Sequence, residues 1–136
     1  MSRVLAFADG FTSASAPTGA GSVIETYTIA NNATGGSVVT FDGSTTRTVF
    51  ADFELRRSTS LGVFIQSGSL IFSYDGAWSM SFGNYMGDEM FVDTIANTEH
   101  VKLMINSSTG AVTFDSGNMS GTSYSGTLKL NIVRIV

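Results

Sequence analysis

Cysteine is absent from this chain of 136 residues, and histidine and proline each occur once. Without cysteine there is no disulfide framework and no thiolate chemistry, so cysteine usage leaves the compartment of the protein open. Zinc and copper sites are built mainly from clustered His, Cys and carboxylate ligands. The sequence therefore predicts no metal site and no cofactor.

Charge is also scarce. Charged residues make up 13% of the chain, seven of its residues are Lys or Arg, and the net charge is −4. Phosphate binding requires several clustered basic groups, so we expect no nucleic-acid partner. A neutral, polar surface suits a protein that is held in an assembly better than one that relies on charge repulsion for solubility.

Long apolar runs are missing near the N-terminus. The longest, residues 4–8, is too short for the core of a signal peptide or for a membrane span. The sequence predicts no membrane partner.

Core-forming residues are plentiful, because 43% of the residues are hydrophobic and ten are Phe. This length and composition predict one folded domain. Residues 1–21 show little alternation, are rich in small residues and contain Pro17, which indicates an extended N-terminal arm. The folded domain is expected over residues 22–136.

Period-two alternation is clearest over residues 46–57. Val49, Ala51, Phe53 and Leu55 share one face of the expected strand, and the other face is polar except at Phe50. Further strands are expected over residues 23–29, 37–41, 61–65, 70–74, 78–82, 90–95, 100–105, 112–114 and 126–136.

Turn signals separate these strands. Asp75-Gly76 predicts a hairpin of two alternating runs joined by a two-residue loop, and residues 83–88 predict a loop. The echoes Phe41-Asp42-Gly43 and Tyr74-Asp75-Gly76 are interpreted as hairpin ends. With no helical periodicity, the pattern predicts an all-β fold of two packed antiparallel sheets, a jelly-roll-like or other sandwich.

The chain has weak candidates for a metal site and for a catalytic triad. Asp88, Glu89 and Asp93 could bind calcium, but they lack the spacing of a calcium loop, and a solvated loop is the favoured interpretation. His100 could belong to a Ser-His-Asp triad, but no nucleophile-elbow motif is present. We expect a surface histidine.

Glycosidase chemistry has one candidate pair, Asp52 with Glu54. Both acids lie on the same face of one strand, where pairing with Arg47 or Arg56 is the favoured explanation. The sequence therefore predicts no catalytic residues and a protein that is not an enzyme.

Aromatic residues are the remaining functional signal. A sugar-binding platform or a subunit contact could be formed by Phe50, Trp78, Tyr85 and Tyr124. For Trp78, a place in the core beside Met80 and Phe82 is the favoured alternative.

The chain as a whole resembles small virion structural proteins of tailed bacteriophages. The features in common are the Met1-Ser2-Arg3 opening, an arm of small residues, a charge-poor β domain, and a hairpin-like stretch over residues 105–121. The resemblance implies a capsid cement or decoration protein on the capsid surface of the virion, which binds the major capsid protein and bridges its subunits. Self-association as a dimer or trimer is expected.

The arm suggests how such a protein would bind. Phe7 and Phe11 could enter pockets between shell subunits while the arm adds to the edge of a neighbouring sheet. Two alternatives stay open: a receptor-binding component of a tail fibre or baseplate, and a carbohydrate-binding β-sandwich. The absence of heptads favours the cement protein over the fibre.

Overall fold

The computed structural model describes residues 22–136. The predicted arm, with Phe7 and Phe11, therefore lies outside the described residues. The predicted domain boundary at residue 22 is not tested. The described part contains eight strands: β1 (Val23–Thr28), β2 (Gly36–Thr40), β3 (Thr48–Thr59), β4 (Gly62–Tyr74), β5 (Trp78–Gly87), β6 (Val101–Ile105), β7 (Ala111–Ser116) and β8 (Ser125–Ile135).

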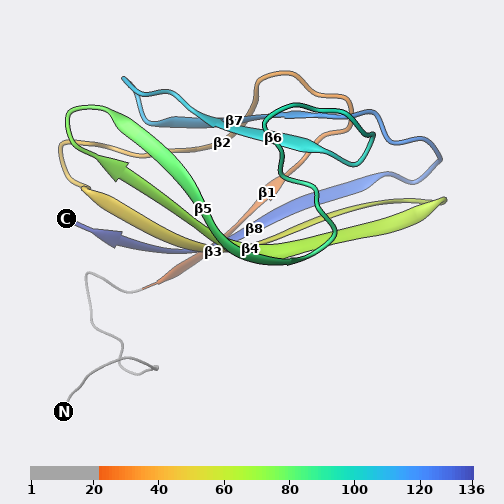
Figure 1. Cartoon of the computed structure of the whole chain (residues 1–136), viewed down its shortest axis with the longest axis horizontal. Helices are drawn as coiled ribbons and strands as arrows, with labels where there is room; N and C mark the ends of the chain where they lie inside the picture. The colour runs from red at the N-terminus through yellow and green to blue at the C-terminus, as the bar shows by residue number, and fades with distance from the viewer. Residues whose placement is uncertain (1–21) are drawn as a thin grey trace, which may run out of the picture.

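These strands form two antiparallel sheets. One has five strands in the order β1-β8-β3-β4-β5, and the other has three in the order β2-β7-β6. The smaller sheet lies over the larger one (Figure 1). The predicted all-β class with two antiparallel sheets is confirmed, while the jelly-roll-like arrangement stays a prediction. No helix long and apolar enough to cross a membrane occurs in residues 22–136.

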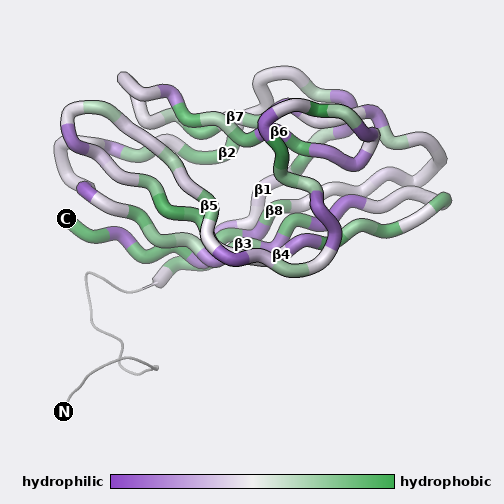
Figure 2. Tube along the Cα trace, viewed as in Figure 1, coloured by the Kyte–Doolittle hydropathy of each residue, from purple (hydrophilic) through white to green (hydrophobic). Residues whose placement is uncertain are grey.

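The core lies between the two layers, and Figure 2 shows hydrophobic residues in the strands of both. Strand β3 follows its predicted alternation: its inward side chains are buried, and Phe50 on the other face is 46% exposed. Strand β3 pairs along almost its whole length with β4 on one side and β8 on the other. The core is made of Ile29, Val38, Phe41, Val49, Ala51, Phe53, Leu55, Leu70, Phe72, Trp78, Met90, Phe91, Val101, Leu103, Val112, Phe114, Leu128, Leu130 and Ile132.

Three local predictions are wrong around β4 and β5. The two strands expected over 61–65 and 70–74 are one continuous strand, and β5 continues through the loop expected over 83–88. A strand over 90–95 is replaced by a single bridge from Phe91 to Val101. Pairing overrides the turn signals here, because β4 and β5 stay paired on both sides of a bulge between Gly68 and Leu70, where their register shifts.

The two Asp-Gly echoes play different parts. Asp75-Gly76 turns the predicted β4–β5 hairpin, with Gly76 at φ 104°, but the loop between Tyr74 and Trp78 has three residues instead of the two predicted. Asp42-Gly43 is not a hairpin end, because it connects β2 in one sheet to β3 in the other. A dipeptide specifies that the chain turns, but not which sheet receives the next strand.

Arg57, near the end of β3, is fully buried and forms hydrogen bonds with four other segments of the chain. Its guanidinium also lies over the ring of Tyr124, 5.4 Å from the centroid. Its acceptors, at 2.8 to 3.3 Å, are the hydroxyl of Tyr124, the side-chain oxygen of Asn31 and the backbone carbonyls of Thr98, His100 and Gly117. These bonds satisfy the donors of a charge that would otherwise be costly to bury.

Candidate functional site

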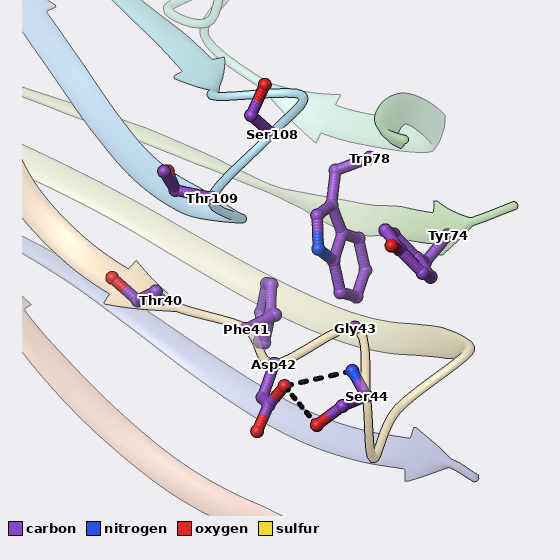
Figure 3. A pocket seen from close by; sticks show the side chains of 9 residues that line it. All are labelled: Thr40, Phe41, Asp42, Gly43, Ser44, Tyr74, Trp78, Ser108 and Thr109. Carbon is purple, nitrogen blue, oxygen red and sulfur yellow. Dashed lines mark hydrogen bonds between the residues drawn. The ribbon is translucent and has the colours of Figure 1, made fainter. Parts of the chain in front are cut away.

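A shallow pocket of about 360 Å³ opens where three connections meet at one end of the molecule. The connections are the β2–β3 loop, the β4–β5 hairpin and the β6–β7 turn (Figure 3). Its lining consists of Thr40, Phe41, Asp42, Gly43, Ser44, Tyr74, Trp78, Ser108 and Thr109. The pocket therefore combines aromatic rings with hydroxyl groups and one carboxylate.

Aromatic packing holds the pocket in shape. The ring of Trp78 lies 5.6 Å from that of Phe41 and 5.3 Å from that of Tyr74, centroid to centroid. Gly110 lets the β6–β7 turn approach this cluster: it has φ 76°, and a Cβ there would lie 2.7 Å from Nε1 of Trp78. The backbone N–H of Phe41 donates to the carbonyl of Gly110 at 3.0 Å.

The carboxylate of Asp42 is fixed by its own loop. Its Oδ1 accepts from the backbone N–H of Ser44 at 2.9 Å and from the Ser44 hydroxyl at 2.7 Å (Figure 3). These two hydrogen bonds stabilise the ionised form and lower the pKa of Asp42 below its usual value. Nearby, the guanidinium of Arg47 lies 5.8 Å from the centroid of the Tyr74 ring.

This lining suits a small polar ligand that carries hydroxyl groups. Asp42 can accept hydrogen bonds, and the serine and threonine hydroxyls can donate or accept them. Trp78 is 4% exposed, so it supports the wall rather than presenting a ring face for stacking. Asp42 is the one acid in the lining, and the pocket lacks the second carboxylate of a glycosidase.

His100 does not lie at the surface as predicted. It is 8% exposed, and its Nδ1 accepts from the backbone N–H groups of Ala96 and Asn97, each at 3.2 Å. These two hydrogen bonds hold the loop before β6 against the imidazole ring. A sequence pattern that marks the polar face of a strand does not reveal such a loop.

The acidic candidates are dispersed. Asp52 and Glu54 lie exposed on the outer face of β3, where their β8 neighbours are Asn131 and Lys129. The predicted pairing of either acid with Arg47 or Arg56 is not formed within residues 22–136. The same part of the chain holds no group of three His, Cys, Asp or Glu placed to bind a metal ion.

Asp88, from the predicted acidic cluster, has a structural contact. Its Oδ2 accepts from the backbone N–H of Ile65 at 2.8 Å, and its own N–H donates to the carbonyl of Ile65. Asp88 thereby continues the pairing of β4 and β5 beyond the end of β5.

The four predicted aromatic residues are not brought together. Phe50 is 46% exposed on β3, and Tyr85 is 50% exposed on β5. Trp78 is buried, so the core interpretation describes it, and Tyr124 donates to the carbonyl of Ile29 at 2.5 Å while accepting from Arg57. Whether Phe50 and Tyr85 contact a partner stays a prediction.

Phe50 belongs instead to a surface that the sequence did not predict. Strand pairing places it directly opposite Ile71 on β4 and Val133 on β8, on the outer face of the five-stranded sheet. Ile24 and Ile135 lie nearby on that face and are 72% and 44% exposed. We call these five residues the outer patch.

Both surfaces left a signal in the sequence. Phe50 is the one residue that breaks the polar side of its strand, and it marks the outer patch. The two echoes begin with Phe41 and Tyr74, which both line the pocket. Neither signal was sufficient, because strand order decides which side chains become neighbours.

No protein-family model and no curated protein matches this chain. Among solved structures, the tailspike protein of Acinetobacter phage vB_ApiP_P1 aligns with 98% of the chain at 15% sequence identity and a TM-score of 0.42. The chain spans 26% of the length of that tailspike. A TM-score of this size does not establish a shared fold.

Proposed function

We propose that this chain is a structural protein of a tailed-bacteriophage virion and, more specifically, a capsid cement protein that binds the outer shell and bridges capsid subunits. The outer patch is the observation that carries the proposal. Its support from the sequence is the charge-poor composition and the resemblance to small virion proteins. The major capsid protein is the proposed partner.

The outer patch has the chemistry of a protein contact. Apolar side chains gather at the centre of protein interfaces, where charged residues are depleted. Ile24, Phe50 and Ile135 present such side chains on a regular sheet surface. On the same face of β3 the charged residues begin with Asp52, two positions after Phe50, and continue with Glu54 and Arg56. Many copies on one shell would turn weak contacts of this kind into stable attachment.

Copy number in purified particles tests the location. Quantitative mass spectrometry, with the major capsid protein as internal standard, should give a number close to that of the capsid protein. A few copies per particle would overturn the cement role in favour of a tail or baseplate component, and absence from particles would overturn the virion role.

Particle binding by matched variants tests the surface. Phe50→Ser should weaken binding to shells about tenfold or more, because it removes an apolar anchor from the patch. Arg56→Ser changes an exposed residue on the same face of the same strand and should bind like the unmodified chain. Equal binding by the two variants would contradict a role for the outer patch.

A second candidate is a carbohydrate-binding module, and the pocket favours it. Hydroxyl groups, a carboxylate held in its charged form and an aromatic wall suit a sugar ligand. Binding to a glycan array should be lost in Asp42→Ala and kept in Asp75→Ala, since both residues are exposed aspartates in Asp-Gly turns and only Asp42 lines the pocket. Absence of binding by the unmodified chain would contradict this function.

A further inference from the structure

The sheet edges of this molecule are unequally protected. An edge strand leaves one row of backbone N–H and C=O groups without strand partners, and proteins shield such rows with charge, proline, short length or a covering segment. Strand β2 is five residues long. Beside β6, the backbone N–H of Val101 donates to Met90 at 2.8 Å, and Phe91 bridges to Val101. Strand β1 carries Glu25.

Within residues 22–136, strand β5 lacks these protections apart from one bulge in its pairing with β4. It is ten residues long and contains no charged residue and no proline. Over residues 58–87 the single charge is that of Asp75, in the hairpin turn. Within residues 22–136, the backbone of β5 on the side away from β4 makes one hydrogen bond, from the N–H of Trp78 to Ser107 at 2.9 Å.

The side chains of β5 extend this open edge with apolar surface. Phe82 is 41% exposed, Tyr85 is 50% exposed and Met86 is 76% exposed. Exposed aromatic and Met side chains beside free backbone groups combine the two sources of strength in strand addition: main-chain hydrogen bonds and side-chain contacts. Strand β5 is the last strand of the larger sheet.

We propose that two copies of this chain pair through β5 in antiparallel orientation, joining their five-stranded sheets across a twofold axis. In such an interface each copy presents the same surface to the other, so a charge near the twofold axis faces its own copy. Two chains of net charge −4 repel one another, and β5 is the long edge where close approach brings no charged strand residues together. Strand β5 has no charged side chain with which a partner of opposite charge could pair.

The pairing is a property of the isolated chain. It goes beyond the proposed place in a virion and does not depend on it, because the mass of the purified protein reports it without any particle. Failure of the pairing and failure of the virion role are therefore separate results.

The mass of the full chain in solution tests the pairing. Light scattering after size-exclusion chromatography should give twice the chain mass of 14.3 kDa. Ser81→Lys and Asn84→Lys, both at exposed positions of β5, should weaken the dimer about tenfold or more, because each brings two like charges to the twofold interface. Thr28→Lys, exposed on the opposite edge strand β1, should leave the dimer intact.

Cross-linking provides a readout that does not depend on dimer stability. Because the natural chain has no cysteine, a single cysteine at Ser81 or Asn84 can form a disulfide only between copies. Oxidation should give covalent dimers with one or both of these variants and not with Thr28→Cys. A monomeric or trimeric mass for the unmodified chain, or equal effects of changes on β5 and β1, would overturn the pairing.

Discussion

The two faces of β3 carry opposite chemistry on one continuous strand. The inner face buries apolar side chains up to Leu55 and ends in the fully buried charge of Arg57. The outer face carries the exposed ring of Phe50 and then solvated charges from Asp52 through Arg56. Hydrophobic residues thus occur on both faces, and so do charged ones.

This comparison shows that residue type alone does not reveal which positions maintain the fold. Arg57 is charged and internal because its donors all find acceptors, whereas Phe50 is apolar and external because the second sheet covers only the other face. Stability should depend on the inner face and association on the outer one. The following substitutions test that division.

The largest loss of stability is expected from Arg57→Met. The substitution leaves the buried acceptor groups around the guanidinium without partners, which should lower the free energy of unfolding by about 4 kcal/mol. Arg56→Met, at the exposed neighbouring position, should change it by less than about 0.5 kcal/mol. Urea unfolding followed by circular dichroism measures both. Similar losses would show that the Arg57 hydrogen bonds contribute little.

Phe53→Ala should have the next largest effect. Phe53 is 4% exposed and its ring contacts that of Phe91 at 5.0 Å between centroids. Removing it should cost about 3 kcal/mol through lost burial and the cavity that remains. A shift in the urea midpoint without a change in slope would report this loss directly. A change below about 1 kcal/mol would mean that the core collapses around the gap.

Phe50→Ala should cost less than about 1 kcal/mol, because the ring is half exposed in the free chain. Its matched partner is Phe53→Ala, which removes the same ring from the other face of the same strand. Thermal unfolding of the two variants side by side gives the comparison. Equal costs would show that the outer patch is part of the stabilising core rather than a free surface.

The smallest effect is expected for Glu54 and Lys129, which are cross-strand neighbours on the outer face. A solvated pair of this kind contributes roughly 0.3 kcal/mol. A double-mutant cycle with Glu54→Ala and Lys129→Ala measures the coupling free energy. A coupling above about 1 kcal/mol would place this pair among the contacts that hold the sheet together.

Much of the fold was predictable because residue alternation and turn dipeptides are local signals of strands and hairpins. Alternation identified β3, and the Asp75-Gly76 dipeptide identified the β4–β5 hairpin. The closing segment was predicted as a strand over residues 126–136, and β8 lies between β1 and β3. The pairing partners of the strands were not predictable. For this reason β4 was predicted as two strands and the second half of β5 as a loop.

The candidate site was less predictable. Asp42 and Tyr74 are far apart in the chain and become neighbours because the β2–β3 connection crosses between sheets beside the β4–β5 hairpin. The burial of His100 likewise depends on the loop folding back onto its ring. Such contacts arise from the choice of strand order, about which a linear pattern carries little information.

The sequence by itself determined the all-β class, the alternating faces of β3, and the scarcity of charge and of metal-binding side chains. These follow from composition and from a period of two residues, which are local properties. Only the tertiary structure decided that Arg57 is internal, that the outer patch is continuous and that β5 is an open edge. Those properties depend on which strands lie side by side, because burial and hydrogen bonding are set by neighbours that are distant in the chain.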